Sequence, residues 1–161
     1  MDESSQFHTV RGYQRLEQQD NPLTSAMEDY LEMIFRYSRK DGYIRINTLS
    51  EHLNVAAPSA TKMVQNLSRL GYVDYRKYEF IALTEKGKEI GQYLLWRHSM
   101  IETFLRNLGV RGELLTDTEL VEHDLSGAAI RKMSLFNSFL EQNPDILKRY
   151  EEFAQSDTES K

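Results

Sequence analysis

Residues 54–71 read NVAAPSATKMVQNLSRLG and contain the strongest structural signal in the chain. The segment predicts a tight turn followed by a helix, because Pro58 suits the first turn of a helix and Gly71 suits the position just after its end. The apolar residues that recur with helical spacing, and that we expect to be buried, are Ala60, Val64, Leu67 and Leu70. The opposite side is short, polar and basic, which suits contact with DNA phosphates and base edges.

Two more helices are predicted before this segment. Thr24 or Ser25 starts the first, which ends near the turn at Gly42. The second starts at Asn47 or Thr48, and Thr48-x-x-Glu51 has the spacing of a capping box. Two helices joined by a tight turn form a helix-turn-helix, in which the second helix enters the major groove.

A β-hairpin is predicted directly after the helix-turn-helix. From Tyr72 to Leu83 the apolar period changes towards two, and the residues 76–79, Arg-Lys-Tyr-Glu, form the hairpin tip. A basic tip in this position is typical of the wing of a winged helix. The residues that we expect to contact DNA are Pro58, Ser59, Thr61, Lys62, Gln65, Asn66, Arg69, Arg76 and Lys77.

The remainder of the chain is predicted to be helical. A long helix runs from Thr84 to about Leu108, a second carries residues 119–123, and a third spans about 126–142. Pro144 then opens a short terminal helix that ends in a polar tail. The fold class is therefore mainly α, with an N-terminal winged helix-turn-helix that has a small two-stranded wing, followed by a helical domain.

Composition restricts the possible functions. The 161 residues include no cysteine, which excludes disulfides, thiolate metal sites and thiol nucleophiles, and which fits a reducing compartment. The net charge of −5 argues against general affinity for nucleic acid, although basic residues gather around the wing. Residues 1–21 lack the features of a secretory signal, and no apolar run reaches the length of a membrane span, so we expect a cytoplasmic protein.

Two acidic clusters lie 90 residues apart, Asp29-x-x-Glu32 and Glu119-x-x-Glu122-His123. On a helix, residues spaced three or four apart project from one face, so each cluster converges. Carboxylates that lie this close repel one another unless a cation joins them. Oxygen donors with imidazole and without sulfur predict a site for a hard or borderline divalent metal.

Each of these residues also has a purely structural explanation. Glu119 could close a capping box with Thr116, and Asp29 and Glu32 could be first-turn acids that complement a helix dipole. His98 alone could be an ordinary packed or surface histidine. Glu102 could pair with Arg106 or accept a hydrogen bond from His98. The charge-rich residues 148–152 are expected to form a solvated helix face.

The chain resembles the diphtheria toxin repressor family of metal-dependent repressors, and within it the manganese-sensing branch, from about Leu23 to about Tyr150. The segments that carry the resemblance are 27–32 (MEDYLE), 58–65 (PSATKMVQ), 83–87 (LTEKG), 97–98 (RH) and 119–123 (ELVEH). The resemblance implies a two-metal site whose six ligands are Asp29, Glu32, His98, Glu119, Glu122 and His123. The iron-sensing branch is expected to have methionine in place of Asp29 and cysteine in place of Glu119, so the carboxylates favour Mn²⁺.

The resemblance also implies partners and a function. We expect a homodimer that binds operator double-stranded DNA and takes two Mn²⁺ per subunit. Other divalent metals are expected to substitute for Mn²⁺, and no small organic cofactor or membrane is expected to take part. Its targets would be manganese-uptake genes. The implied organisation is 1–22 as a polar extension of unknown role, 23–92 as the winged helix-turn-helix, 93–143 as the helical dimerisation and metal-binding domain, and 144–161 as the terminal helix and tail.

Three features depart from the family pattern. Asp124 stands where a second histidine is common, Glu79 stands where the wing tip usually has glycine, and the extension before Leu23 has no counterpart. Other interpretations also stay open. They are a winged-helix regulator that senses Fe²⁺, Zn²⁺ or a non-metal ligand, and a dinuclear carboxylate helical metalloenzyme.

Overall fold

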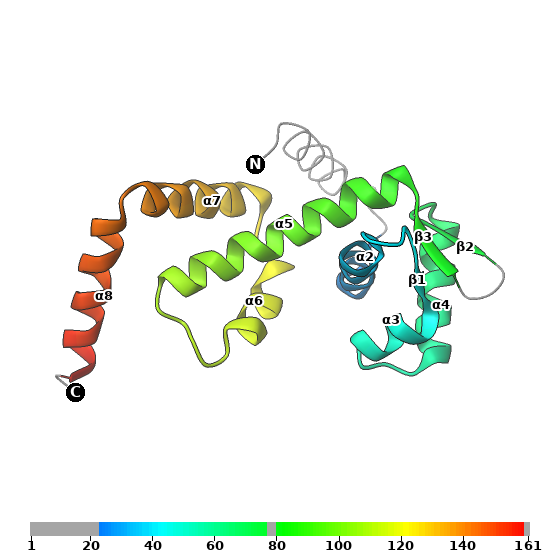
Figure 1. Ribbon diagram of the computed structural model, residues 1–161, viewed down its shortest axis with the longest axis horizontal. Helices are drawn as coiled ribbons and strands as arrows, with labels where there is room; N and C mark the ends of the chain where they lie inside the picture. Colours follow the sequence, from blue (N-terminus) through cyan, green and yellow to red (C-terminus); the bar gives the residue numbers. More distant parts are fainter. Residues whose placement is uncertain (1–22, 77–79, 160–161) are drawn as a thin grey trace. The chain divides into compact units, whose positions relative to one another are not determined.

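The computed structural model describes residues 23–76 and 80–159, and Figure 1 shows their elements. The elements in chain order are α2 (Ser25–Ser38), β1 (Ile44–Arg45), α3 (Ile46–His52), α4 (Ala57–Arg69), β2 (Val73–Arg76), β3 (Phe80–Leu83), α5 (Glu85–Asn107), α6 (Leu114–Glu122), α7 (Gly127–Gln142) and α8 (Pro144–Glu159). They form two compact units that divide between Trp96 and Arg97, inside α5. The predicted fold class, a mainly helical chain with an N-terminal winged helix-turn-helix, is confirmed.

The first unit is built around the helix-turn-helix formed by α3 and α4, with α2 packed against both. Three of the four residues that were predicted to be buried on α4, Ala60, Val64 and Leu67, are fully buried, and Leu70 is half-buried. They share one core with the fully buried residues Leu31, Ile34, Leu49, Ile81, Ile90 and Leu94. Because this core fixes one side of α4, the opposite side faces outwards.

Several predicted helix ends are confirmed. Thr24 is the N-cap of α2, where its Oγ1 accepts a hydrogen bond from the backbone N–H of Met27 (3.3 Å). Pro58 lies in the first turn of α4. Gly71 follows α4 with a φ of 77°, a left-handed conformation that favours glycine.

The predicted start of the second helix is wrong. α3 begins at Ile46, its N-cap is Arg45, and no side chain caps it, so Thr48 and Glu51 form no capping box. Tertiary pairing explains the difference: Arg45 stays extended because it pairs with Phe80 across the sheet. Ile46 is 2% exposed, so burial of its side chain favours a helix that starts there.

The sheet contains the predicted wing and one further strand. β2 and β3 pair antiparallel, with Val73 opposite Leu83, as the two-stranded wing requires. The two-residue strand β1, which was not predicted, pairs with the other edge of β3 and gives the order β1-β3-β2. The hairpin tip falls largely on residues 77–79, outside the described residues.

The start of α5 is held closely against the helix-turn-helix. Thr84 Oγ1 accepts a hydrogen bond from the N–H of Gly87 (3.1 Å), as expected of a residue that caps this helix. A Cβ atom on Gly87 would lie 2.0 Å from the carbonyl oxygen of Tyr72, so glycine is required there. Lys86 Nζ donates to the carbonyl of Leu70 (3.2 Å) and lies 4.0 Å from the centre of the Tyr72 ring. Lys86 therefore supports the end of α4.

The second unit contains the end of α5 with α6, α7 and α8. Asn137 on α7 is buried, and its Nδ2 donates to the carbonyl of Met100 on α5 (2.9 Å). Phe104 and Phe136 meet edge to face with ring centres 5.9 Å apart. These contacts, together with burial of Ile130, pack α7 along this part of α5.

The last two helices start where the sequence predicted. Ser126 is the N-cap of α7 and accepts a hydrogen bond from the N–H of Ala129 (3.2 Å), and α8 starts at Pro144. α8 has 16 residues, so it is longer than the short helix that was predicted. The stretch 148–152 is exposed throughout, as expected of a solvated face.

Among residues 23–76 and 80–159, no helix has both the length and the apolar character needed to cross a membrane.

Candidate functional site

The outward side of α4 carries most of the residues that were predicted to contact DNA. Pro58, Ser59, Lys62, Gln65 and Arg69 are exposed. The remaining two on this helix, Thr61 and Asn66, are half-buried. Arg76 ends β2, and Lys77 lies outside the described residues.

Two of these side chains are already engaged within α4. Thr61 Oγ1 donates to the carbonyl of Ala57 (2.9 Å), and Arg69 donates through Nη2 to Oδ1 of Asn66. The Arg69–Asn66 pair holds the guanidinium close to the helix while both groups remain at the surface. Lys62 and Arg69 lie seven residues apart, so they project from the same side of α4 and form a basic, polar surface.

The first acidic pair, Asp29 and Glu32, lies on α2. The helix begins at Ser25 and its first-turn acid is Glu28, so the explanation of Asp29 and Glu32 as first-turn acids is wrong. Asp29 is exposed, whereas Glu32 is 9% exposed. Burial raises the pKa of the Tyr30 hydroxyl between them, so this phenol stays neutral at physiological pH.

Glu32 has a partner that was not identified from the sequence. Arg36 Nη2 donates to Glu32 Oε1 at 2.6 Å, one helical turn along α2. The i, i+4 spacing of Glu and Arg is a recognised signal for such a pair, so the sequence contained the information.

The second cluster is centred on the carboxylate of Glu122, which is 3% exposed at the end of α6. Its Oε2 lies 2.9 Å from Nδ1 of His98 on α5, and its Oε1 lies 3.7 Å from Nε2 of His123. His98 is itself buried, at 7% exposure. One buried carboxylate is therefore held between two imidazoles.

Arg97 orients the second imidazole. Its Nη2 lies 3.3 Å from Nδ1 of His123, and because a guanidinium can only donate, Nδ1 is the acceptor. The neutral ring then carries its proton on Nε2, towards Glu122. Sequence reasoning missed this role, because Arg97 and His123 are 26 residues apart.

The surroundings of Glu119 and Glu102 differ from those of His98, Glu122 and His123. Glu119 lies one turn before Glu122 on α6 and is exposed. Because α6 starts at Leu114 with Glu113 as its N-cap residue, a capping box between Thr116 and Glu119 is wrong. Glu102 accepts a hydrogen bond from Arg106, which confirms the simple i, i+4 pairing.

The chemistry of this donor set fits a divalent metal. A buried carboxylate is unfavourable without a counter-charge, and neutral imidazoles are common ligands of Mn²⁺, Fe²⁺ and Zn²⁺. The chain contains no cysteine, so no thiolate is available to favour a soft ion here. His98, Glu122 and His123 could therefore hold such an ion together with further carboxylates.

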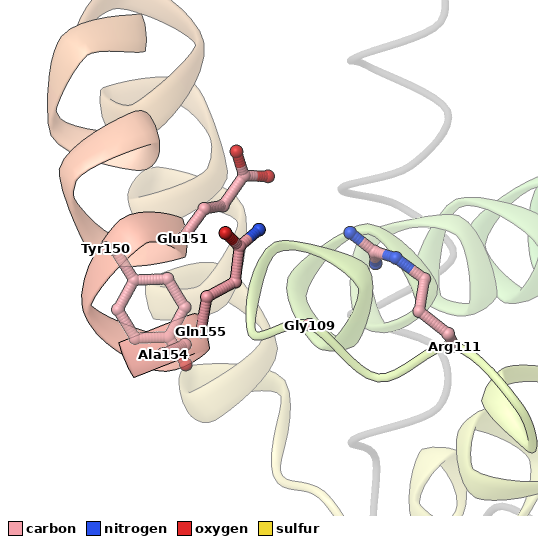
Figure 2. Close-up of a pocket in the computed structure, with 6 residues that line it drawn as sticks. All are labelled: Gly109, Arg111, Tyr150, Glu151, Ala154 and Gln155. Carbon is pink, nitrogen blue, oxygen red and sulfur yellow. The ribbon is translucent and has the colours of Figure 1, made fainter. Parts of the chain in front are cut away.

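A separate cavity of about 350 Å³ lies between α8 and the loop after α5 (Figure 2). Its lining residues are Gly109, Arg111, Tyr150, Glu151, Ala154 and Gln155. Arg111 donates to the carbonyl of Arg106 (2.6 Å), and the Tyr150 hydroxyl donates to that of Leu108 (3.1 Å). These bonds satisfy the end of α5, and none of the predicted site residues lines this cavity.

Two family models match the chain over most of its length. The iron dependent repressor N-terminal DNA binding domain matches residues 22–80, and the iron dependent repressor metal binding and dimerisation domain matches residues 84–151. The first covers the winged helix. The second covers the helices that carry His98, Glu119, Glu122 and His123.

Two similar proteins are both named HTH-type transcriptional regulator MntR. The one from Lysinibacillus sphaericus (strain C3-41) is 41% identical over 129 residues, which are 80% of this chain and 93% of that protein. The one from Oceanobacillus iheyensis (strain DSM 14371) is 41% identical over 125 residues, 76% of this chain and 85% of that protein.

Solved structures agree with these matches. The manganese regulator SloR has a TM-score of 0.58 and 29% identity, over 70% of this chain and 54% of its own. The metal-dependent transcriptional regulator MtsR has a TM-score of 0.65 and 27% identity, over 73% of this chain and 55% of its own. This chain thus spans about half the length of these two solved chains.

These relatives are named as regulators, and both matching models describe repressor domains, so the interpretation as a metalloenzyme is wrong. The chain therefore belongs to the iron dependent repressor family, which is the family of the diphtheria toxin repressor, and is a metal-dependent DNA-binding repressor.

Proposed function

We propose that this protein represses manganese-uptake genes when Mn²⁺ is plentiful, and that it acts in the cytoplasm as a homodimer on operator DNA. The observation that carries the proposal is the buried Glu122 carboxylate between the imidazoles of His98 and His123, in a chain that also has a winged helix. The names of the manganese regulator SloR and of the two MntR proteins support the choice of metal and targets.

The proposed ligands come from both units of the chain. Asp29 and Glu32 belong to α2 of the first unit, which contains the winged helix and is called the DNA-reading unit below. His98, Glu119, Glu122 and His123 belong to the second unit. Six oxygen and imidazole donors suffice for two Mn²⁺ per subunit, and this composition favours hard and borderline ions. The exposed carboxylate of Glu119 can reorient at little cost when it becomes a ligand.

Sharing ligands between the units would couple metal occupancy to DNA binding. In a two-fold dimer, the recognition helices must lie about 34 Å apart to enter successive major grooves. When bound, the ions would supply the positive charge that allows the carboxylates of both units to lie together. Asp29 and Glu32 would then hold α2, and with it the recognition helix α4, in the DNA-competent arrangement.

The identity of the metal can be tested with a metal panel. Operator binding is measured by gel shift at fixed salt, with a duplex selected from a random pool in the presence of Mn²⁺. We expect Mn²⁺ to activate binding at a lower fractional occupancy than Fe²⁺, Co²⁺ or Zn²⁺, even though Zn²⁺ can bind more tightly by the Irving–Williams order. Equal binding with no metal at all would favour the alternative of a non-metal ligand.

Lys62 and Arg69 are expected to contact DNA phosphates. Lys62→Ala and Arg69→Ala should each weaken operator binding and lower the slope of log K against log salt by about one per protomer, because each change removes one phosphate contact. Lys148→Ala is the matched control, since Lys148 is an exposed lysine on α8 in the second unit. A variant whose salt slope equals that of the wild type does not contact phosphate.

A further inference from the structure

Glu32 is already paired with a permanent cation. Its carboxylate is 9% exposed, and Arg36 Nη2 donates to its Oε1 at 2.6 Å. Hydrogen bonds between ionised partners are short and about twice as strong as neutral ones. In the metal-free protein, the guanidinium therefore neutralises a buried carboxylate that would otherwise be costly.

Arg36 itself is incompletely satisfied. Its side chain is 37% exposed, yet its Nε is buried and has no acceptor within residues 23–76 and 80–159. A buried donor without a partner is unfavourable, and movement of the side chain into water would hydrate it. Arg36 therefore makes a strong hydrogen bond to Glu32 through Nη2 but has an energetic penalty at Nε. This combination suits a cation that a metal ion can displace from Glu32.

We propose that Arg36 competes with the metal ion for Glu32 and so sets the concentration of metal at which the protein responds. This inference rests on the proposed function, because it takes Glu32 as a ligand. Glu122 differs, because its carboxylate contacts two imidazoles, and a neutral imidazole can itself become a metal ligand. A guanidinium keeps its charge at any physiological pH, so Arg36 must release the carboxylate oxygen or remain as a like charge beside the ion.

The test is the Mn²⁺ affinity of Arg36→Met, measured by calorimetry and by the electron paramagnetic resonance signal of free Mn²⁺. Methionine keeps much of the length of arginine and suits a helix, but it has no charge. We expect binding to become about tenfold tighter, because one charged hydrogen bond of modest strength no longer competes. Arg36→Lys keeps the charge and should remain within about threefold of the wild type.

Arg39→Met is the matched control. Arg39 follows the last residue of α2, and its guanidinium lies 5.8 Å from the centre of the Phe35 ring. The substitution removes the same charge close to the same helix, so it separates a general effect of net charge from the specific pair. Its Mn²⁺ affinity should stay within about twofold of the wild type, since exposed charges are well screened.

Thermal unfolding gives a readout that needs no DNA. In the presence of chelator, Arg36→Met should have a lower Tm than the wild type, because Glu32 loses its counter-charge. Added Mn²⁺ should then raise its Tm by more than it raises that of the wild type, since tighter binding to the folded state stabilises it further.

Failure of this inference can be distinguished from failure of the proposed function by Glu32→Gln. If Glu32→Gln binds Mn²⁺ as tightly as the wild type, Glu32 is not a ligand, and both proposals are overturned for this residue. If Glu32→Gln weakens binding while Arg36→Met leaves it unchanged or weaker, the metal site stands and the role of Arg36 as a competitor is overturned.

Discussion

Glu122→Ala is expected to weaken Mn²⁺ binding by roughly a hundredfold or more, since losses of about 10- to 100-fold already follow the removal of groups that only support a ligand. Glu122 is the residue on which the second cluster is centred, and it lies within 3.7 Å of both imidazoles. Without its carboxylate, His98 and His123 lose the negative charge that makes the cluster attractive to a cation. Calorimetry with Mn²⁺ measures the change directly.

Two further variants make the result on Glu122 specific. Glu122→Gln keeps the size of the side chain and one oxygen, so it should fold as the wild type does while it still loses most of the affinity. Glu141→Ala removes an exposed carboxylate from α7 and should bind Mn²⁺ normally. Tight binding that survives Glu122→Ala would rule out a metal site at this cluster.

Asp29→Ala is expected to weaken Mn²⁺ binding by at least about tenfold, although Asp29 belongs to the DNA-reading unit. The reason is the proposed sharing of ligands between the two units. Because Asp29 is exposed, its truncation should change the free energy of unfolding of the metal-free protein by no more than about 0.5 kcal/mol. Loss of metal affinity without loss of stability would therefore report on the site alone.

Glu28→Ala is the control for Asp29, because Glu28 is the neighbouring acid on the same helix. It should leave Mn²⁺ affinity within about twofold of the wild type, since it removes a charge without removing a ligand. Should Asp29→Ala bind Mn²⁺ as the wild type does while Glu122→Ala does not, Asp29 would not be a ligand. The proposed link between metal and DNA would then depend on Glu32 alone.

The parts of the fold that were predictable depend on local signals. The apolar row of α4, the cap at Thr24 and the left-handed Gly71 all follow from residues close together in sequence, and all are present. The strand β1 was not predictable in this way, because two residues have no period of their own. β1 exists because β3 offers it a partner 35 to 37 residues later in the chain, with Ile44 opposite Ile81 and Arg45 opposite Phe80.

The same distinction applies to the start of α3. Thr48 and Glu51 have the spacing of a capping box, but pairing in the sheet and burial of Ile46 begin the helix earlier. Here tertiary structure overrides a local preference that is worth only about 1 kcal/mol. A capping box between Thr116 and Glu119 failed in a similar way, since α6 already begins at Leu114.

For the candidate site, the types of residue were predictable and their partners only in part. Glu122 and His123 were identified from their spacing and His98 from the family resemblance, and the second unit brings the three together. Arg36 could have been paired with Glu32 from their spacing, whereas the contact of Arg97 with His123 depends on how α5 and α6 pack. These arginines matter because, without metal, Arg36 neutralises the Glu32 carboxylate and Arg97 fixes the tautomer of His123.

The most direct test is operator affinity with and without Mn²⁺, measured by fluorescence anisotropy at one fixed ionic strength. If metal binding and DNA binding are coupled, saturating Mn²⁺ should tighten operator binding by about 5- to 150-fold, and the operator should tighten Mn²⁺ binding by the same factor. The Glu122→Ala protein should bind the operator equally weakly with and without Mn²⁺. Wild-type protein that binds the operator with the same affinity in chelator and in Mn²⁺ would contradict the account.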